Sequence, residues 1–240
     1  MGKYLIFGAT GGIGSAIAQE LHDGQHDMHL AGRNEPKLRE MAAMFSASWS
    51  KCDVLEAGHL EAAIQAAGDD LDGLIYAVGS INLKPVAKLT DADFMRDFEL
   101  NAMAAAKAVQ LALPALKAGQ GASVLLFSTV AVQQGFSAHA SVSMAKGAVE
   151  GLTRALAAEL APKVRVNAIA PSLTDTEIAK PITASEQMAK AIASMHAIPR
   201  IGLASDMAAL ASLLLTSQGS WITGQVIGVD GGRSTLRTKG

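Results

Sequence analysis

Cysteine is almost absent from this sequence: Cys52 is the single one in 240 residues. No internal disulfide can form, so we expect a reducing compartment, the cytoplasm, and a Cys52 that packs in the core. An excess of one charge is also lacking, because 20 basic and 22 acidic residues leave a net charge of −2. With no basic run, no apolar run near the roughly 18 residues of a membrane span and no expected metal site, we predict neither a nucleic acid nor a membrane as partner.

Aromatic residues are scarce, at 4% of the chain, whereas half of all residues are hydrophobic. Short apolar runs alternate with longer amphipathic or alanine-rich stretches, which predicts a parallel sheet with helices on both faces. We therefore expect a single α/β domain over 1–240: a Rossmann-like, doubly wound, seven-stranded parallel sheet. The expected strands are 3–7, 27–31, 47–52, 73–78, 123–128, 164–169 and 225–229.

The stretches between these strands predict the helices, which we place at 13–22, 36–45, 57–67, 91–117, 141–161, 176–195 and 205–216. The longest interval between strands, 171–224, begins with helical patches and two prolines. We interpret 171–200 as a lid over a substrate, because inserts at the carboxyl end of a strand often cover a ligand. Its apolar residues favour an apolar substrate, although they would serve equally well as the lid's own packing (Ile178, Ile182, Met188, Ile192 and Met195).

The sequence "FGATGGIG" follows the first expected strand and opens a helix. Glycines allow a sharp turn and a close approach to a pyrophosphate, and the amides of a helix N-terminus favour an anion. This strand–turn–helix context predicts a dinucleotide site, as opposed to a bare structural turn. The site would use Gly8, Thr10, Gly11, Gly12, Ile13 and Gly14.

The end of the second strand, "LAGRN", indicates which dinucleotide binds. A preference for NAD usually places an acid here for the ribose 2′-hydroxyl, but this sequence has Gly32 followed by Arg33. A guanidinium suits a 2′-phosphate through paired hydrogen bonds. We therefore expect NADP(H) in preference to NAD, with a surface arginine as the alternative interpretation.

The glycine loop, "CDV", "LNA", "SMAKGAVEGLTRALAAEL", "RVNAIAPSLTDTEI" and "ITGQVIGVDGG" occur in an order that resembles the short-chain dehydrogenase/reductase family along nearly the whole chain. The resemblance implies that Asp53 and Val54 hold the adenine, and that Asn101 belongs to the catalytic tetrad. Lys146 would bind the nicotinamide ribose and lower the pKa of its partner acid. The rest of the implied cofactor site is Val78, Gly79, Pro171, Thr174 and Thr176.

Two departures from the family pattern stand out. The Asn-Asn-Ala-Gly turn after the fourth strand is replaced by 76–79, "YAVG". The Tyr-x-x-x-Lys motif reads "VSMAK", so Val142 stands where the proton-donating tyrosine is expected, and the catalytic serine position holds Thr129. A threonine hydroxyl can still polarise a carbonyl, but valine has no proton to donate.

Other donors are few. Of the two tyrosines, Tyr4 is expected in the core and Tyr76 at the end of a strand, facing the sheet or the adenine side. His139 precedes Lys146 by seven residues, which returns to nearly the same helical face, and histidine is the commonest general acid. A helix N-terminus disfavours imidazolium, so His139 would act mainly as a neutral N–H donor. Water held by Thr129, Ser143 or Asn101 is the alternative.

Two functions remain open. The first is an NADP(H)-dependent oxidoreductase of the short-chain type, reducing a carbonyl or an activated C=C of a small apolar molecule with an altered proton donor. The second is a non-catalytic NADP(H)-binding sensor or structural subunit, which would keep the glycine loop and Lys146. Small residues along 91–117 and 141–161, together with the family resemblance, also predict a homo-oligomer, most simply a tetramer.

Overall fold

The computed structural model describes residues 2–237, and its centre is one parallel sheet of seven strands. The sheet order is β3-β2-β1-β4-β5-β6-β7, so the chain starts in the middle, builds one half and returns to build the other. This confirms the predicted doubly wound sheet. The strands are β1 (Lys3–Phe7), β2 (Asp27–Gly32), β3 (Ser48–Lys51), β4 (Gly73–Tyr76), β5 (Ala122–Phe127), β6 (Val164–Pro171) and β7 (Val226–Val229).

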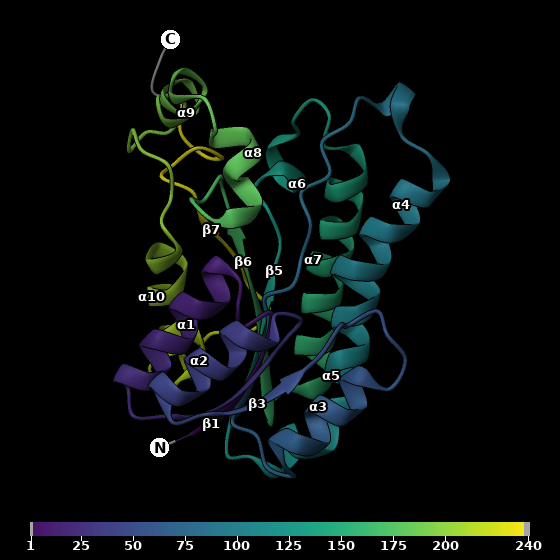
Figure 1. Ribbon diagram of the computed structural model, residues 1–240, viewed down its shortest axis with the longest axis vertical. Coiled ribbons are helices and arrows are strands. Elements are labelled where there is room, and N and C mark those ends of the chain that lie inside the picture. Colours follow the sequence, from purple (N-terminus) through teal and green to yellow (C-terminus); the bar gives the residue numbers. More distant parts are fainter. Residues whose placement is uncertain (1, 238–240) are drawn as a thin grey trace.

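Helices cover both faces of the sheet (Figure 1). One face carries α1 (Gly12–Asp23), α2 (Glu35–Phe45) and α10 (Ala204–Leu215), and the other carries α3 (His59–Ala67), α4 (Asp91–Phe98), α5 (Ala104–Ala118) and α7 (Ala140–Leu160). Each layer has its own apolar cluster, and the strands contribute alternate side chains to the two clusters. Cys52 and Tyr4 are 2% and 3% exposed, which confirms that both are core residues.

One predicted helix is divided in the structure. The segment predicted as 91–117 forms α4, then a π-helical segment at Glu99–Met103, then α5, which keeps Pro114 inside it. The wider π turn rotates the residues after it relative to α4, and such turns often occur at functional sites. Asn101 lies in the middle of this segment.

The segment after β6 is helical in short pieces. It contains a 3₁₀ turn at Glu177–Ala179, α8 (Lys180–Thr183) and α9 (Glu186–Ala193), where the sequence predicted one helical patch. These pieces stand above the carboxyl ends of the strands (Figure 1). Three further short pieces were not predicted: 3₁₀ turns at Val86–Lys88 and Ser217–Gly219, and α6 (Ala131–Gln134).

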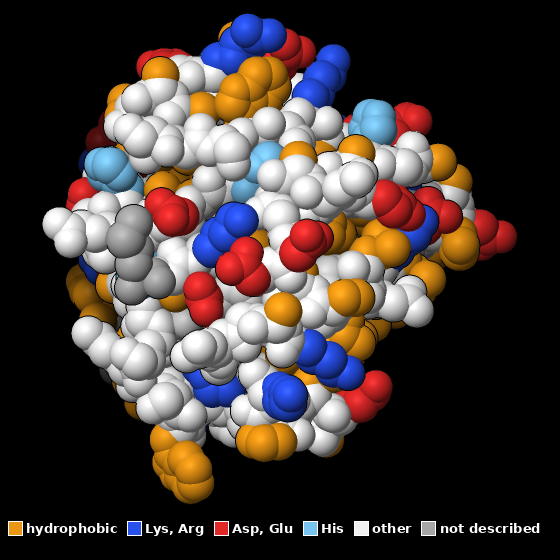
Figure 2. Space-filling view, turned by 90° about the horizontal axis from the view of Figure 1, so that it is seen from below, with side chains coloured by type: hydrophobic (Ala, Val, Ile, Leu, Met, Phe, Trp, Pro, Cys, Tyr) orange, Lys and Arg blue, Asp and Glu red, His pale blue; other side chains and the backbone are white. Residues whose placement is uncertain are grey.

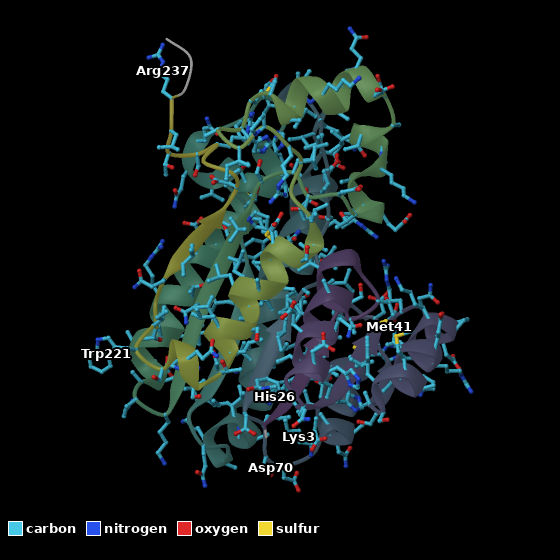
Figure 3. The ribbon with its side chains drawn as sticks, turned by 90° about the vertical axis from the view of Figure 1, so that its left-hand side faces the viewer. Lys3, His26, Met41, Asp70, Trp221 and Arg237 are labelled. Atoms are coloured by element: carbon cyan, nitrogen blue, oxygen red, sulfur yellow. The ribbon has the colours of Figure 1, made fainter. Side chains whose placement is uncertain are left out.

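The described surface is mixed in character. On the face in Figure 2, basic and acidic side chains are interspersed with apolar ones. Trp221 is 98% exposed and points away from the body of the molecule (Figure 3). Within residues 2–237, no helix is long and apolar enough to cross a membrane.

Candidate functional site

A pocket of about 710 Å³ opens at the carboxyl ends of the strands, where a doubly wound sheet binds its ligands. Segments that follow each of the seven strands, from β1 to β7, contribute to its wall. Every site residue predicted from the sequence lines this pocket except Gly14 and Asn101, which lie directly behind its wall. The strand ends therefore bring together residues that are far apart in the chain.

The glycine loop is shaped by close approaches that leave no room for side chains. Gly8 has a φ of +79°, and a Cβ there would lie 2.7 Å from the Ala77 carbonyl oxygen. A Cβ on Gly14 would lie 2.2 Å from the Gly8 oxygen, so Gly14 packs α1 against the turn. The first amides of α1 have no partner within the helix and are free to bind an anion. This loop fits a dinucleotide pyrophosphate.

Charged groups gather at the ends of β2 and β3. The Arg33 guanidinium is 3.9 Å from the Asp53 carboxylate, and its side chain is 77% exposed. Lys37, at the start of α2, donates a hydrogen bond from Nζ to the Thr10 carbonyl oxygen at 2.8 Å. Sequence reasoning missed Lys37 and the pocket-lining Asn34, although "RNEPK" carries the signal of an Asn-capped, Pro-started helix.

Lys146 lies in α7 with its side chain against the end of β5. Its Nζ donates to the Phe127 carbonyl oxygen at 2.8 Å, and the residue is buried. Burial lowers the pKa of Lys146 to about 8, while the negative charge of Asp97 acts in the opposite direction. The group is therefore an ammonium close to losing its proton near neutral pH.

Asn101 points toward the same small space. Its Nδ2 donates to the Asp97 carbonyl oxygen at 2.8 Å and to Ser80 Oγ at 3.1 Å. Its Oδ1 is buried and has no hydrogen-bond partner within the described part of the chain. A Cβ on Gly79 would lie 3.0 Å from this Oδ1 and 3.3 Å from Lys146 Nζ. An unpaired acceptor and a cation thus face the space beside Gly79.

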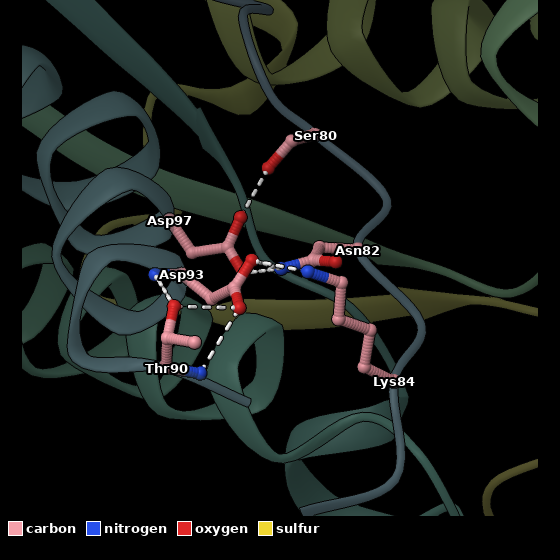
Figure 4. Close-up of polar contacts among 6 residues, drawn as sticks. All are labelled: Ser80, Asn82, Lys84, Thr90, Asp93 and Asp97. Carbon is pink, nitrogen blue, oxygen red and sulfur yellow. Dashed lines mark hydrogen bonds and ion pairs between the residues drawn. The ribbon is translucent and has the colours of Figure 1, made fainter. Parts of the chain in front are cut away.

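A polar network lies behind Asn101, which contacts two of its members, Ser80 and Asp97. Figure 4 shows the network itself. The buried Asp97 carboxylate accepts from Ser80 Oγ at 2.8 Å and from Asn82 Nδ2 at 3.2 Å. Asn82 Nδ2 also donates to the Asp93 carboxylate at 3.5 Å, and Asp93 accepts in turn from Lys84 Nζ at 2.6 Å. The network ties the loop after β4 to α4, and sequence reasoning did not identify it.

No tyrosine of residues 2–237 lines the pocket, and the position of the expected phenol is apolar. Val142 is buried and lines the pocket wall. Tyr76 is also buried, and its hydroxyl donates to the Leu100 carbonyl oxygen at 2.7 Å. Thr129 lines the pocket, and its Oγ1 accepts from the Ala131 amide at 3.3 Å, which leaves the hydroxyl proton free to donate.

His139 also lines the pocket but does not lie within the helix, because it is the N-cap of α7. Its Nδ1 is 2.8 Å from the Ser137 carbonyl oxygen, which can only accept, so Nδ1 carries a proton. In a neutral ring, Nε2 is then an acceptor. The N–H of the neutral ring is therefore already used by the Ser137 oxygen, and the predicted role of His139 as a neutral N–H donor would require this bond to break.

The segment 171–200 contributes apolar residues to the pocket. Four of the five residues named from the sequence line it: Ile178, Ile182, Ile192 and Met195. Met188 does not; it is 54% exposed on α9. Sequence reasoning did not assign Phe136 and Arg233 to the site, and it interpreted Arg233 as part of a solvated basic tail, but both residues line the pocket.

Comparison with known proteins agrees with this geometry. Residues 8–234 match the family described as enoyl-(acyl carrier protein) reductase. Two tropinone reductase homologues of Arabidopsis thaliana are each 33% identical over 238 residues, 95% of this chain and 78% or 89% of theirs.

Solved structures agree as well. A short-chain dehydrogenase/reductase from Brucella melitensis superposes with a TM-score of 0.91 at 29% identity, covering 98% of this chain and 97% of that one. An actinorhodin polyketide ketoreductase variant solved with NADPH gives a TM-score of 0.92 at 25% identity, covering 98% of each chain. This chain therefore belongs to the short-chain dehydrogenase/reductase family, whose members are NAD(P)-dependent oxidoreductases acting on small molecules.

Proposed function

We propose that this protein is an NADP(H)-dependent reductase of a carbonyl or activated C=C in a small, largely apolar molecule, and that its proton comes from a group other than tyrosine. The observation that carries the proposal is that the buried Lys146 Nζ and the unpaired Asn101 Oδ1 both lie next to Gly79, in a pocket that Val142 lines with an apolar side chain. A protein that only binds nucleotide would have no use for a buried, unsatisfied acceptor, which is costly to keep.

The preference for NADP(H) is supported by the groups at the end of β2. Gly32 carries no acid, and a Cβ there would already lie 3.3 Å from Thr10 Oγ1. Arg33 is exposed and its ion pair with Asp53 is long, at 3.9 Å, so its guanidinium can turn toward a 2′-phosphate. Lys37 adds a second positive charge next to the loop. Two cations and no unpaired acid at this position favour the phosphorylated cofactor.

We assign the role of proton donor to the Lys146 ammonium. A water bound at Asn101 Oδ1 would then return a proton to Lys146. Bound NADPH would supply the hydride. The ammonium then gives its proton to the oxygen or carbon that becomes negative, and its lowered pKa makes it a better acid than an ordinary lysine. The Thr129 hydroxyl is positioned to polarise the substrate carbonyl. Ser143 is less well suited, because its Oγ already donates to the Ala131 oxygen.

The decisive experiment builds the missing phenol. Val142→Tyr would place a hydroxyl next to Lys146, and we expect ketone reduction with NADPH to rise by about 10²-fold or more, the usual contribution of a general acid. Val142→Phe is the matched control, because it adds the same ring without the hydroxyl. Lys146→Ala in the Val142→Tyr background should remove the gain.

Cofactor binding and melting of each variant are measured alongside. A Val142→Tyr protein that folds, binds NADPH and reduces no ketone in a broad panel would argue against a reductase site. A wild-type protein that binds NADPH but oxidises it with no carbonyl or enone would favour the sensor. If NADPH is oxidised with enones but not with ketones, and His139→Ala abolishes this activity, His139 would be the proton donor in place of Lys146.

A further inference from the structure

Arg233 is a charged residue in the pocket wall that the proposed reaction does not use. It follows β7 in a turn, where its amide donates to the Asp230 carbonyl oxygen at 3.1 Å. Its guanidinium carbon lies 4.8 Å from the centre of the Phe136 ring. Stacking on an aromatic face holds a guanidinium in one plane and leaves its edge N–H groups free to donate.

Nothing in residues 2–237 neutralises this charge. No acidic group of the described chain lies within 4 Å of the Arg233 guanidinium, and its nitrogens donate to no described acceptor. Asp230, three residues earlier, is already used by the Gly232 amide at 2.8 Å and by the amide and hydroxyl of Ser234. A partly buried guanidinium with unused donors is an incomplete arrangement that an anion would complete.

The other charges of the pocket are accounted for. Arg33 faces Asp53 at 3.9 Å, and Glu177 is paired with Lys180 at 2.5 Å. The sheet order separates Arg233 from the nucleotide charges, because Arg33 and Asp53 follow β2 and β3 at one edge and Arg233 follows β7 at the other. The reacting region around Lys146, at the end of β5, lies between them.

The neighbours of Arg233 are mostly apolar. Phe136 also packs edge-on against His139, with ring centres 5.4 Å apart, and Ile192 and Met195 line the same pocket. We propose that Arg233 binds the carboxylate of the substrate, so that the substrate class is an oxo or enoyl carboxylic acid with an apolar chain between its two groups. One planar fork matches a carboxylate in two parallel hydrogen bonds. This inference rests on the proposed function.

The test compares oxo acids of increasing chain length with their methyl esters, which keep the carbonyl and lose the charge. The wild type should prefer one acid over its ester in kcat/KM by about 10- to 100-fold, the range of one charged hydrogen-bonded pair. Arg233→Met should abolish that preference mainly through KM and leave the ester unchanged. Arg237→Met, an exposed arginine of the same tail, is the matched control.

A second readout needs no turnover. Saturated carboxylic acids of the same lengths should bind the protein–NADPH complex in calorimetry, and Arg233→Met should weaken them by a similar factor. Ester reduction equal to acid reduction, or acid binding indifferent to Arg233, would overturn the inference and leave the reductase standing. Acid binding that depends on Arg233 without any turnover would support the anion site and count against the proposed reaction. Equal loss for acid and ester in Arg233→Met would reduce Arg233 to a structural contact with Phe136.

Discussion

Lys146 carries a charge in a place with very little water, so its protonation must respond to pH within the range of ordinary assays. Because burial lowers its pKa to about 8, the ammonium form is lost as the pH rises above that value. We predict that kcat/KM with NADPH is level below pH 8 and falls about tenfold per pH unit above it. A profile that stays level from pH 7 to 9.5 would exclude the Lys146 ammonium as the required form.

Arg33 offers the sharpest test of cofactor choice. Arg33→Ala should weaken NADPH by about 1.5–3 kcal/mol, the scale of a charged hydrogen bond, and change NADH little. Titration by fluorescence measures both constants. Arg39→Ala is the control, because Arg39 lies nearby in α2 but pairs with Glu35 at 2.7 Å and lies over Trp49. Equal losses for the two cofactors in Arg33→Ala would contradict a role at the 2′-phosphate.

At the scale of elements, α1 depends on one close contact with the turn before it. A Cβ on Gly14 would lie 2.2 Å from the Gly8 oxygen, whereas a Cβ on Gly151 in α7 would meet nothing within 4 Å. Gly14→Ala should therefore cost roughly 1–3 kcal/mol of unfolding free energy and weaken NADPH, through overpacking. Gly151→Ala should add about 0.5–1 kcal/mol, because alanine favours a helix. Urea unfolding measures the free energy of unfolding of both variants. A change of the same sign in the two would contradict the close contact assigned to Gly14.

Most elements could be predicted from the sequence because each has a local cause. The strands are apolar runs ended by glycine or polar residues, and α2 begins at a capping asparagine with Pro36 behind it. The break between α4 and α5 could not be predicted, because 91–117 keeps its apolar period and Pro114, the residue that would suggest a break, lies well beyond it. The π turn is visible only in the backbone.

The parts of the site that carry a local sequence motif could be predicted, and the contacts between distant residues could not. The glycine loop and Lys146 carry local motifs, and the strand order brings them to one pocket. The Ser80–Asp97 contact and the Arg233–Phe136 stack join residues 17 and 97 positions apart, with no spacing rule to reveal them. The orientation of the His139 ring depends on the Ser137 carbonyl oxygen, which a sequence does not place.

At the scale of the whole molecule, one buried histidine makes the free energy of unfolding depend on pH. His29 is 1% exposed between Ser48 Oγ and Ser50 Oγ, each at 2.8 Å, and burial lowers its pKa from 6.5 to about 4. Between these values the unfolded chain binds the proton and the folded chain does not. The unfolding free energy should therefore fall as the pH drops from about 6.5 to 4, by roughly 3 kcal/mol.

Urea unfolding at pH 7, 6 and 5 measures this slope. His29→Gln keeps a side chain that can bind the two serines but takes up no proton, so its stability should change less with pH than that of the wild type. Parallel curves for the two proteins would contradict the assignment. The homo-oligomer remains a prediction, which light scattering at micromolar concentration checks.

Because Cys52 is buried, the rate at which its thiol is labelled can report cofactor binding in the pocket. This thiol is 2% exposed, lines the pocket next to Asp53, and burial together with the charges of Asp53 and Glu61 raises its pKa to about 11. Only a thiolate reacts with thiol reagents, so labelling of the folded protein must wait for a local opening. As the chain has one cysteine, the labelling rate of the native protein measures how often this local opening exposes Cys52. We predict that NADPH lowers the labelling rate of Cys52 by the factor 1 + [NADPH]/Kd. The measurement therefore gives the affinity for the cofactor without any substrate.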